Sequence, residues 1–315
     1  MALEDILEGV YRKLGYTSSP SAEVTERLMG FANEIHRRIL GYPGLSGLRQ
    51  SQTTFSTVAS TPQYSLPQDV ARIIGIRDTT NDSVLRGQSW EWYAGIEPDP
   101  SASTGVSTFW VPAGFSAVSV QPADASKVYV DSTSTSDTGI CHIEGTRTGG
   151  YPFTQSTTMA GTTAVQIGSW SDITAITKFY LSTSAVGTVT LHEDAEGGTE
   201  LVRIPIGQSS AKYLRIALWP TPSSAVTLTL DYIRQIPELQ SSHDEPLLPT
   251  DFHWLLDAGV RMLEYEKMDD RRYPAAVADF QKGVRDLKWF VTQQADGQGR
   301  AVGRSQLGAW YPAGS

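Results

Sequence analysis

The sequence predicts an α+β protein, with helices from both ends of the chain forming a four-helix bundle and a middle region made of β-strands. Apolar residues recur at helical spacing near both ends of the chain. Between them, short stretches of alternating apolar residues are separated by turns rich in Gly, Ser and Thr. Only 19% of the residues are charged, and 10% are aromatic, a composition that favours short strands over a helical enzyme core.

Two helices are predicted within the first 41 residues. The first ends at Gly15 and has its apolar residues on one stripe, namely Leu3, Ile6, Leu7, Val10, Tyr11 and Leu14. For the second, Ser19 is the expected N-cap and Pro20 the first helical residue, and the apolar period runs to Gly41. Each stripe needs a partner to cover it.

From about residue 51 the period changes to two, which predicts a small antiparallel sheet. Two later strands, 213–220 and 226–232, are joined by a Pro/Ser turn and belong to the same region. In the second of them, Val226, Leu228, Leu230 and Tyr232 alternate with polar residues, so we expect these four to face the core.

Residues 119–211 differ from their surroundings and predict an inserted β-sandwich domain of immunoglobulin-like type. Short strand candidates are separated by Ser/Thr/Gly turns, and the stretch has nine acidic and four basic residues. Helices are again predicted after Thr250, carrying apolar residues such as Leu255, Leu256, Phe280 and Val284. The expected domains are therefore a discontinuous core at 1–118 and 212–294 and an insertion at 119–211.

The last segment, 295–315, is predicted to be an extended C-terminal docking arm. It is rich in Gly and has no apolar period. Arginine and aromatic side chains commonly anchor contacts with a partner. The candidate partner-binding residues are Arg300, Arg304, Leu307, Trp310 and Tyr311.

Charge and cysteine content limit the function classes. A net charge of −9 argues against a protein that grips nucleic acid through its phosphates. The N-terminus has no basic segment of a signal peptide, and no apolar run is long enough to span a membrane, so we expect a protein made in the cytoplasm. Cys141 is the single cysteine and is expected to be buried, which leaves no internal disulfide.

The sequence predicts neither an active site nor a cofactor or metal site. The five histidines lack metal-binding spacing; His36, beside Arg37 and Arg38, is expected at the surface, and His253 at a helix start. The acidic turn at 192–196 could bind a hard cation, although a solvated turn is the simpler interpretation.

Two alternative functions stay open. Exposed Trp170, Tyr151 and Tyr180 in the β-sandwich could stack on sugars, which would make the chain a carbohydrate- or receptor-binding protein, or a capsid-decoration protein. An esterase or glycosidase is the other alternative, although no recognisable catalytic motif supports it.

The order of elements resembles that of head-to-tail adaptor (connector, or neck) proteins of tailed bacteriophages. The likeness covers about 1–118 and 212–293 and includes Tyr64 to Asp69, Leu230-Asp231-Tyr232, Pro237 to Leu239, and Leu248 to His253. It implies a non-enzymatic virion protein, a subunit of a dodecameric ring between the portal protein and a tail or nozzle protein. Double-stranded DNA would pass through without specific binding, and the arm near Arg300 to Tyr311 would reach the portal.

Overall fold

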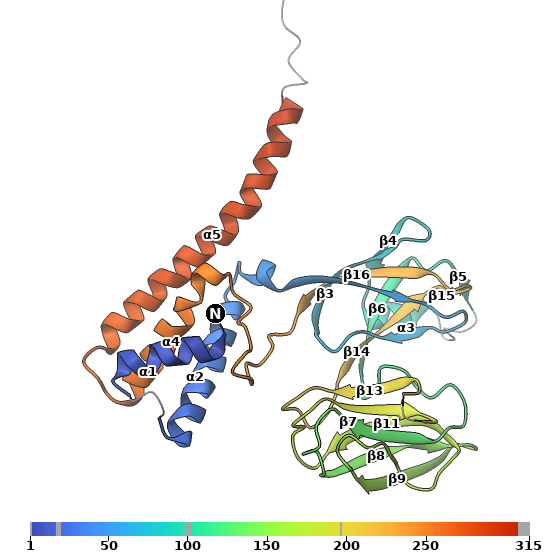
Figure 1. The fold of residues 1–315 in the computed structure, drawn as a ribbon. Coiled ribbons are helices and arrows are strands. Elements are labelled where there is room, and N and C mark those ends of the chain that lie inside the picture. The colour runs from blue at the N-terminus through green and yellow to red at the C-terminus, as the bar shows by residue number, and fades with distance from the viewer. Residues whose placement is uncertain (1, 17–19, 97–98, 100–102, 196, 308–315) are drawn as a thin grey trace, which may run out of the picture. The chain divides into compact units, whose positions relative to one another are not determined.

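The computed structural model divides the chain into two compact units. The first, which we call the helical unit, consists of residues 1–51 and 233–315, and the second, the β unit, consists of residues 52–232. The structure describes the backbone of residues 2–16, 20–96, 99, 103–195 and 197–307, and their side chains up to residue 293. Figure 1 shows helices in the first unit and almost only strands in the second, so the predicted α+β class is confirmed.

Four helices of the helical unit share one hydrophobic core. They are α1 (Leu3–Leu14), α2 (Ala22–Gly41), α4 (Trp254–Lys267) and α5 (Tyr273–Leu307). The helix α4 contacts each of the other three, and ten of its fourteen residues are buried. The apolar stripes predicted at the two ends of the chain therefore cover each other. The finer description as a regular four-helix bundle stays a prediction.

The helix ends agree with the sequence in one case and differ in the other. Gly15 ends α1 in the left-handed conformation, with φ of 81°, which glycine adopts at little cost. The N-cap of α2 is Ser21, whose hydroxyl accepts a hydrogen bond from the Val24 backbone N–H at 3.4 Å. The expected cap, Ser19, lies outside the described residues, and Pro20 precedes the helix.

Helix α5 is longer than predicted. The described backbone is helical as far as Leu307, although an irregular arm was expected from residue 295. Three glycines in this stretch weaken a helix, but Ala, Arg and Gln between them are good helix formers, and nothing in the sequence forces a break before Gly308. The expected extended conformation of the arm is therefore wrong up to Leu307.

The β unit contains a mixed seven-stranded sheet instead of the small antiparallel sheet predicted. The order is β1-β16-β3-β4-β6-β14-β2, and β4 pairs with β6 in parallel. The strands are β1 (Gln50–Ser56), β2 (Gln63–Ser65), β3 (Val70–Asp78), β4 (Ser83–Gly87), β6 (Phe109–Ser116), β14 (Tyr213–Trp219) and β16 (Thr227–Arg234). Its own core includes Leu228, Leu230 and Tyr232, as expected, with Val226 packed against it.

The strands β14 and β16 are not hairpin partners. The Pro/Ser turn joins them in sequence, but β3, β4 and β6 lie between them in the sheet. Beside the sheet, the short helix α3 (Trp90–Ile96) brings Trp92 against Phe109 and Trp219, with ring centroids 4.8 and 5.7 Å from that of Trp92. A two-stranded sheet pairs β5 (Thr104–Gly105) with β15 (Thr221–Pro222).

Residues 118 to 213 form two further sheets with a separate hydrophobic core. One sheet has the order β10-β7-β12-β13, and the other β11-β8-β9. Their strands are β7 (Val128–Ser132), β8 (Ile140–Arg147), β9 (Tyr151–Thr158), β10 (Val165–Gln166), β11 (Ile173–Leu181), β12 (Val189–Glu193) and β13 (Glu200–Ile204). Cys141 lies buried in this core, as expected. The immunoglobulin-like classification stays a prediction.

Candidate interaction surfaces

Buried polar contacts between sequence-distant residues fix α1 and α2 to α4. Glu264 of α4 is fully buried and accepts hydrogen bonds from Arg27 Nη2 at 2.8 Å and from the Tyr16 hydroxyl at 2.7 Å. Burial, together with the contact with Glu264, raises the pKa of Tyr16. Asp257, about two turns earlier in α4, forms ion pairs with Lys13 at 2.5 Å and with Arg261 at 3.3 Å. These carboxylates give the helical unit one fixed packing because a mispaired charge in the core is costly.

His36 lies inside this unit, although its neighbours Arg37 and Arg38 predicted a surface position. Its side chain is fully buried, and its Nε2 accepts a hydrogen bond from the Leu247 backbone N–H at 3.0 Å. Burial lowers its pKa to about 4, so the ring is neutral at pH 7. His253 is also buried and lies directly before α4, as expected, with Nε2 3.0 Å from the Leu248 carbonyl oxygen.

The returning chain segment 238–248 completes the start of α1. The first backbone N–H groups of a helix lack partners inside the helix. Here the N–H of Leu3 donates to the Asp244 carbonyl at 2.9 Å, and that of Glu4 donates to the Ser242 carbonyl at 3.0 Å. Asn33 of α2 exchanges two hydrogen bonds with the Leu239 backbone, at 2.8 and 2.9 Å. The segment thus joins α1 and α2 on one side of the helical unit.

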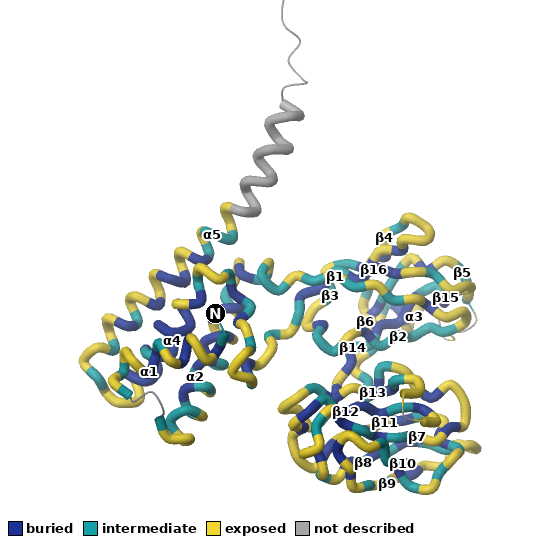
Figure 2. The backbone as a smooth tube through the Cα atoms, viewed as in Figure 1, coloured by how far each residue is buried: buried dark blue, intermediate teal, exposed yellow. Residues whose placement is uncertain are grey.

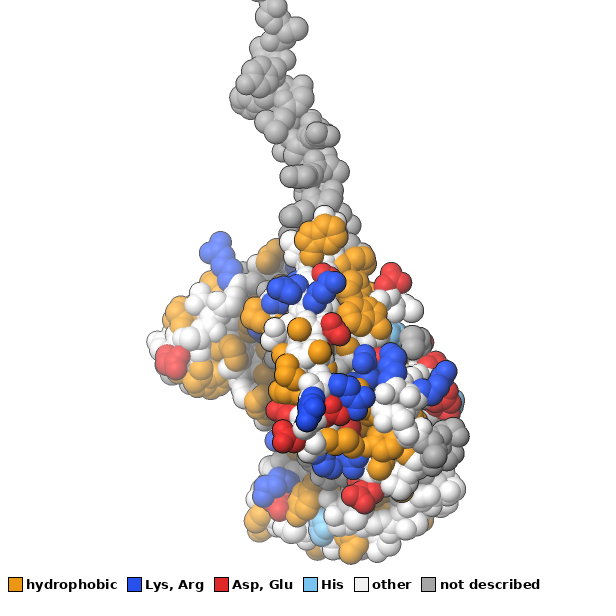
Figure 3. All heavy atoms as spheres, turned by 90° about the vertical axis from the view of Figure 1, so that its left-hand side faces the viewer, with side chains coloured by type: hydrophobic (Ala, Val, Ile, Leu, Met, Phe, Trp, Pro, Cys, Tyr) orange, Lys and Arg blue, Asp and Glu red, His pale blue; other side chains and the backbone are white. Residues whose placement is uncertain are grey.

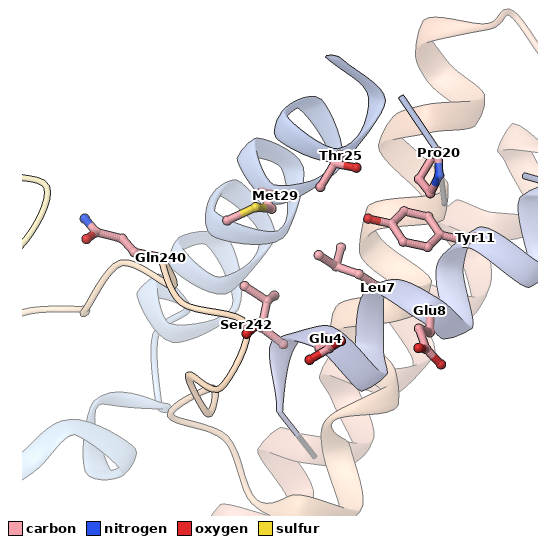
Figure 4. A pocket seen from close by; sticks show the side chains of 10 residues that line it. Glu4, Leu7, Glu8, Tyr11, Pro20, Thr25, Met29, Gln240 and Ser242 are labelled. Atoms are coloured by element: carbon pink, nitrogen blue, oxygen red, sulfur yellow. The ribbon is translucent and has the colours of Figure 1, made fainter. Parts of the chain in front are cut away.

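A groove of about 340 Å³ lies between α1, α2 and this segment. Figure 4 shows Leu7 and Tyr11 reaching from α1 toward α2, which contributes Thr25 and Met29. Glu4 and Glu8 line the groove from α1, and both are exposed. Glu8 has an ion pair with Arg12 at 3.4 Å, and no ion pair of Glu4 is present among the described residues. We call this the α1–α2 groove; it is apolar inside and acidic along one edge.

The outward face of α5 carries an exposed tryptophan among charged residues. Trp289 is 65% exposed. Val284, Leu287 and Val291 turn toward the core, and at 100° per residue the side chain of Trp289 points the opposite way. Lys282, Arg285 and Asp286 lie seven, four and three residues before Trp289 and share its side of the helix, which therefore has one net positive charge. In Figure 2 exposed and buried positions alternate along α5, and in Figure 3 hydrophobic side chains lie among Lys and Arg on the helical unit.

The predicted arm residues lie at and beyond the end of α5. Arg300, Arg304 and Leu307 fall within the helix, but only their backbone is described. Trp310 and Tyr311 lie outside the described residues. Their role in binding a partner therefore stays a prediction. Trp289 is not among the residues predicted from the sequence, although it falls outside the apolar period that Val284, Leu287 and Val291 follow.

The aromatic residues expected to bind sugars do not form one platform. Arg147 covers the Trp170 ring at 3.5 Å from its centroid and is itself held by Asp172 at 2.9 Å. Tyr180 stacks on His142 with centroids 4.8 Å apart. Tyr151 is 69% exposed. Two of the three rings therefore already have a side chain against one face.

The acidic turn uses two of its carboxylates internally, since Asp194 accepts a hydrogen bond from the Lys127 backbone N–H at 3.2 Å. Glu193 is buried and accepts hydrogen bonds from the Ser126 hydroxyl at 2.6 Å and the Ala123 backbone N–H at 2.9 Å. Glu196 lies outside the described residues. In the part of the chain that is described, no cluster of His, Cys, Asp and Glu has the arrangement of a metal site. Burial raises the pKa of the Cys141 thiol to about 11, which makes it a poor nucleophile at pH 7.

A family model described as SU10 adaptor protein matches residues 142–305, just over half of the chain. No curated protein matches the sequence. The match includes α4, most of α5, and the strands from β9 to β16. It runs through most of 119–211, so it does not support the expectation that this stretch is an insertion. Within the described residues, no helix is both long and apolar enough to cross a membrane.

Proposed function

Because the chain belongs to the SU10 adaptor protein family, a phage structural adaptor family, we propose that it is a subunit of the ring that joins the portal to the tail. The family match carries this proposal. In the ring, copies of the helical unit would pack side by side around a channel through which double-stranded DNA passes. The subunit number, expected to be twelve, is part of the same proposal.

The helical unit has the properties that a ring subunit needs. Its helices are fixed by buried polar contacts, so the surfaces it offers to neighbours are held in place before assembly. It exposes an apolar groove on one side, and an exposed tryptophan on the outward face of α5. Exposed apolar patches of this kind mark protein interfaces.

The charge distribution supports a DNA conduit. The β unit has 16 acidic and nine basic residues, whereas the helical unit has 18 and 16. The negative balance predicted from the sequence is thus concentrated in the β unit. A channel wall without a basic excess lets DNA slide because few phosphates are neutralised. The nearly balanced helical unit satisfies this requirement.

The end of α5 and the residues after it are the proposed portal contact. Removing residues 295–315 deletes the arm but leaves in place all the residues of the helical unit's core whose side chains the structure describes. We expect phage supplied only with this truncated chain to accumulate DNA-filled heads without tails, counted by electron microscopy. Paired Arg300→Ala and Arg304→Ala substitutions should produce the same defect more weakly.

A control for folding accompanies this experiment. The truncated chain should keep the thermal unfolding midpoint of the full chain, followed by near-ultraviolet circular dichroism. Normal yields of tailed particles with the truncated chain would contradict the portal contact. Sugar binding by the full chain on a glycan array, abolished by Tyr151→Ala, would instead favour the receptor-binding alternative.

A further inference from the structure

We propose that the outward face of α5 in one subunit packs into the α1–α2 groove of a second copy of the chain, so that copies join head to tail. This inference rests on the proposed ring function and names the two surfaces that would build the ring. Its occupant is a second copy because the same chain carries both an apolar groove with an acidic edge and an exposed tryptophan on a face with a net positive charge.

The α1–α2 groove fits a large side chain. Its volume of about 340 Å³ is at the small end of the range, roughly 300 to 1,000 Å³, that small-molecule pockets span. Leu7, Tyr11 and Met29 give it an apolar lining (Figure 4), and methionine adapts its shape to what it contacts. An indole ring, flat and mostly apolar, matches such a lining. Tryptophan is also the residue most enriched at the energetic centres of protein interfaces.

The edge charges of the two surfaces have opposite net signs. Glu4 and Glu8 line the groove, whereas Lys282, Arg285 and Asp286 on the Trp289 side of α5 leave a net positive charge. Among the described residues, no ion pair involves Glu4, Lys282 or Arg285, and the pair of Glu8 with Arg12 is long and exposed. These charges are therefore available to a partner, and a copy that places Trp289 in the groove brings acids and bases together.

The positions of the two surfaces favour head-to-tail assembly of many subunits over a closed dimer. Helix α4 contacts both α1 and α5, and Trp289 points away from the core that they share. One subunit therefore cannot fill its own groove with its own Trp289. Two different surfaces that recognise each other give a heterologous contact, which repeats from copy to copy and closes into a ring when the rotation permits.

Cross-linking tests the contact directly. A full-length chain carrying Glu8→Cys is mixed with one carrying Arg285→Cys, and a short bismaleimide reagent is added; Cys141 is buried and does not interfere. We expect cross-linked dimers to form at least about tenfold faster than from a mixture of Glu8→Cys and Lys212→Cys chains, because association raises the local concentration of the two thiols. Lys212 is an exposed residue of the β unit and serves as the control for random collision. Equal rates would overturn the proposal.

Charge reversal sharpens the test. The Glu8→Cys chain additionally carries Glu4→Lys, and the Arg285→Cys chain additionally carries Lys282→Glu. Either change alone, opposite the unchanged partner chain, should abolish the rapid cross-linking because the two contacting edges then have charges of the same sign. Mixing the two changed chains should restore it, since the groove edge is then basic and the α5 edge acidic. Failure of the mixture to recover, with both variants folded by circular dichroism, would also overturn the contact.

A third variant separates the indole from the charges. Trp289→Ala should reduce cross-linking at all salt concentrations, whereas the charge contribution should weaken as salt rises. The same variants are then assayed in phage. If the chain joins heads to tails but cross-links no faster than the control, the proposed function stands and this interface is rejected. If the chain cross-links through these surfaces but leaves heads without tails, the interface stands and the adaptor function is rejected.

Discussion

The two units of this chain use their polar residues in different ways. In the helical unit, carboxylates such as Glu264 are buried and pair with residues far away in the sequence. In the β unit, the buried carboxylate of Asp78 accepts hydrogen bonds from the backbone of Thr80 and Asn81 in its own turn, each at 2.9 Å. Most of the ion pairs of that unit are partly exposed, as in Arg77 with Asp231. The buried carboxylates of the helical unit therefore pair with charged residues, whereas those of the β unit accept hydrogen bonds from uncharged donors.

Removing a buried carboxylate should give the largest difference in unfolding free energy between the two units. Glu264→Ala leaves the charge of Arg27 and the hydroxyl of Tyr16 without their shared partner. We expect the helical unit to lose roughly 3 kcal/mol of unfolding free energy, the low end for breaking a buried pair, because Arg27 keeps some access to water. Urea unfolding followed by circular dichroism at 222 nm, where the helices dominate, measures this loss.

The matched control comes from the β unit. Asp231→Asn removes the partner of Arg77 in a pair whose side chains are 46% and 30% exposed, so it should cost less than about 1 kcal/mol. Equal losses for the two variants would remove the contrast between the units.

Lowering the pH should weaken the helical unit through His36. Its pKa is about 4 in the folded chain and about 6.5 when unfolded. The unfolded state therefore binds the proton more readily, and stability that is fully present above pH 6.5 is lost as the pH falls toward 4. The loss is at most about 3 kcal/mol.

Urea unfolding at pH 7 and pH 5 measures this loss. His36→Gln should be less stable than the wild type at pH 7 and should change less between the two pH values. A variant with the same pH dependence as the wild type would assign the effect to other groups.

Substituting a glycine at the close crossing of α2 and α4 should give the smallest change in stability. A Cβ atom on Gly259 of α4 would lie 2.5 Å from the Ile35 side chain of α2, whereas one on Gly30 would meet nothing within 4 Å. Gly259→Ala should therefore cost about 2 kcal/mol through overpacking. Gly30→Ala should instead stabilise α2 by up to about 1 kcal/mol. Thermal unfolding of both variants checks the opposite signs, and stabilisation by Gly259→Ala would show that the crossing can relax.

The sequence predicts what depends on local period and composition. The stripe of α1 and its end at Gly15 agree with the structure because an amphipathic helix and a left-handed cap are local features. The alternation of Leu228, Leu230 and Tyr232 likewise gives the buried face of β16. The family resemblance led to the phage adaptor class, which the family match supports.

Features that depend on distant contacts were not predictable. His36 is buried because the chain returns at Leu247 to cover it, which its neighbours Arg37 and Arg38 do not indicate. The partners of β14 in the sheet, β6 and β2, come from far earlier in the chain. The exposed position of Trp289 becomes visible only once the core face of α5 is known. Such contacts are set by tertiary packing, which overrides local preference.

The discontinuous helical unit affects how the chain folds during synthesis. Helices α1 and α2 leave the ribosome first, but α4, which covers their apolar stripes, follows only after the whole β unit has been made. The β unit is continuous and can complete its fold in the meantime. Its strands β1 and β16 are neighbours, with the Gln52 amide donating to the Asp231 carboxylate at 2.7 Å. The finished β unit thereby holds the two halves of the helical unit together and shortens the loop that late folding must close.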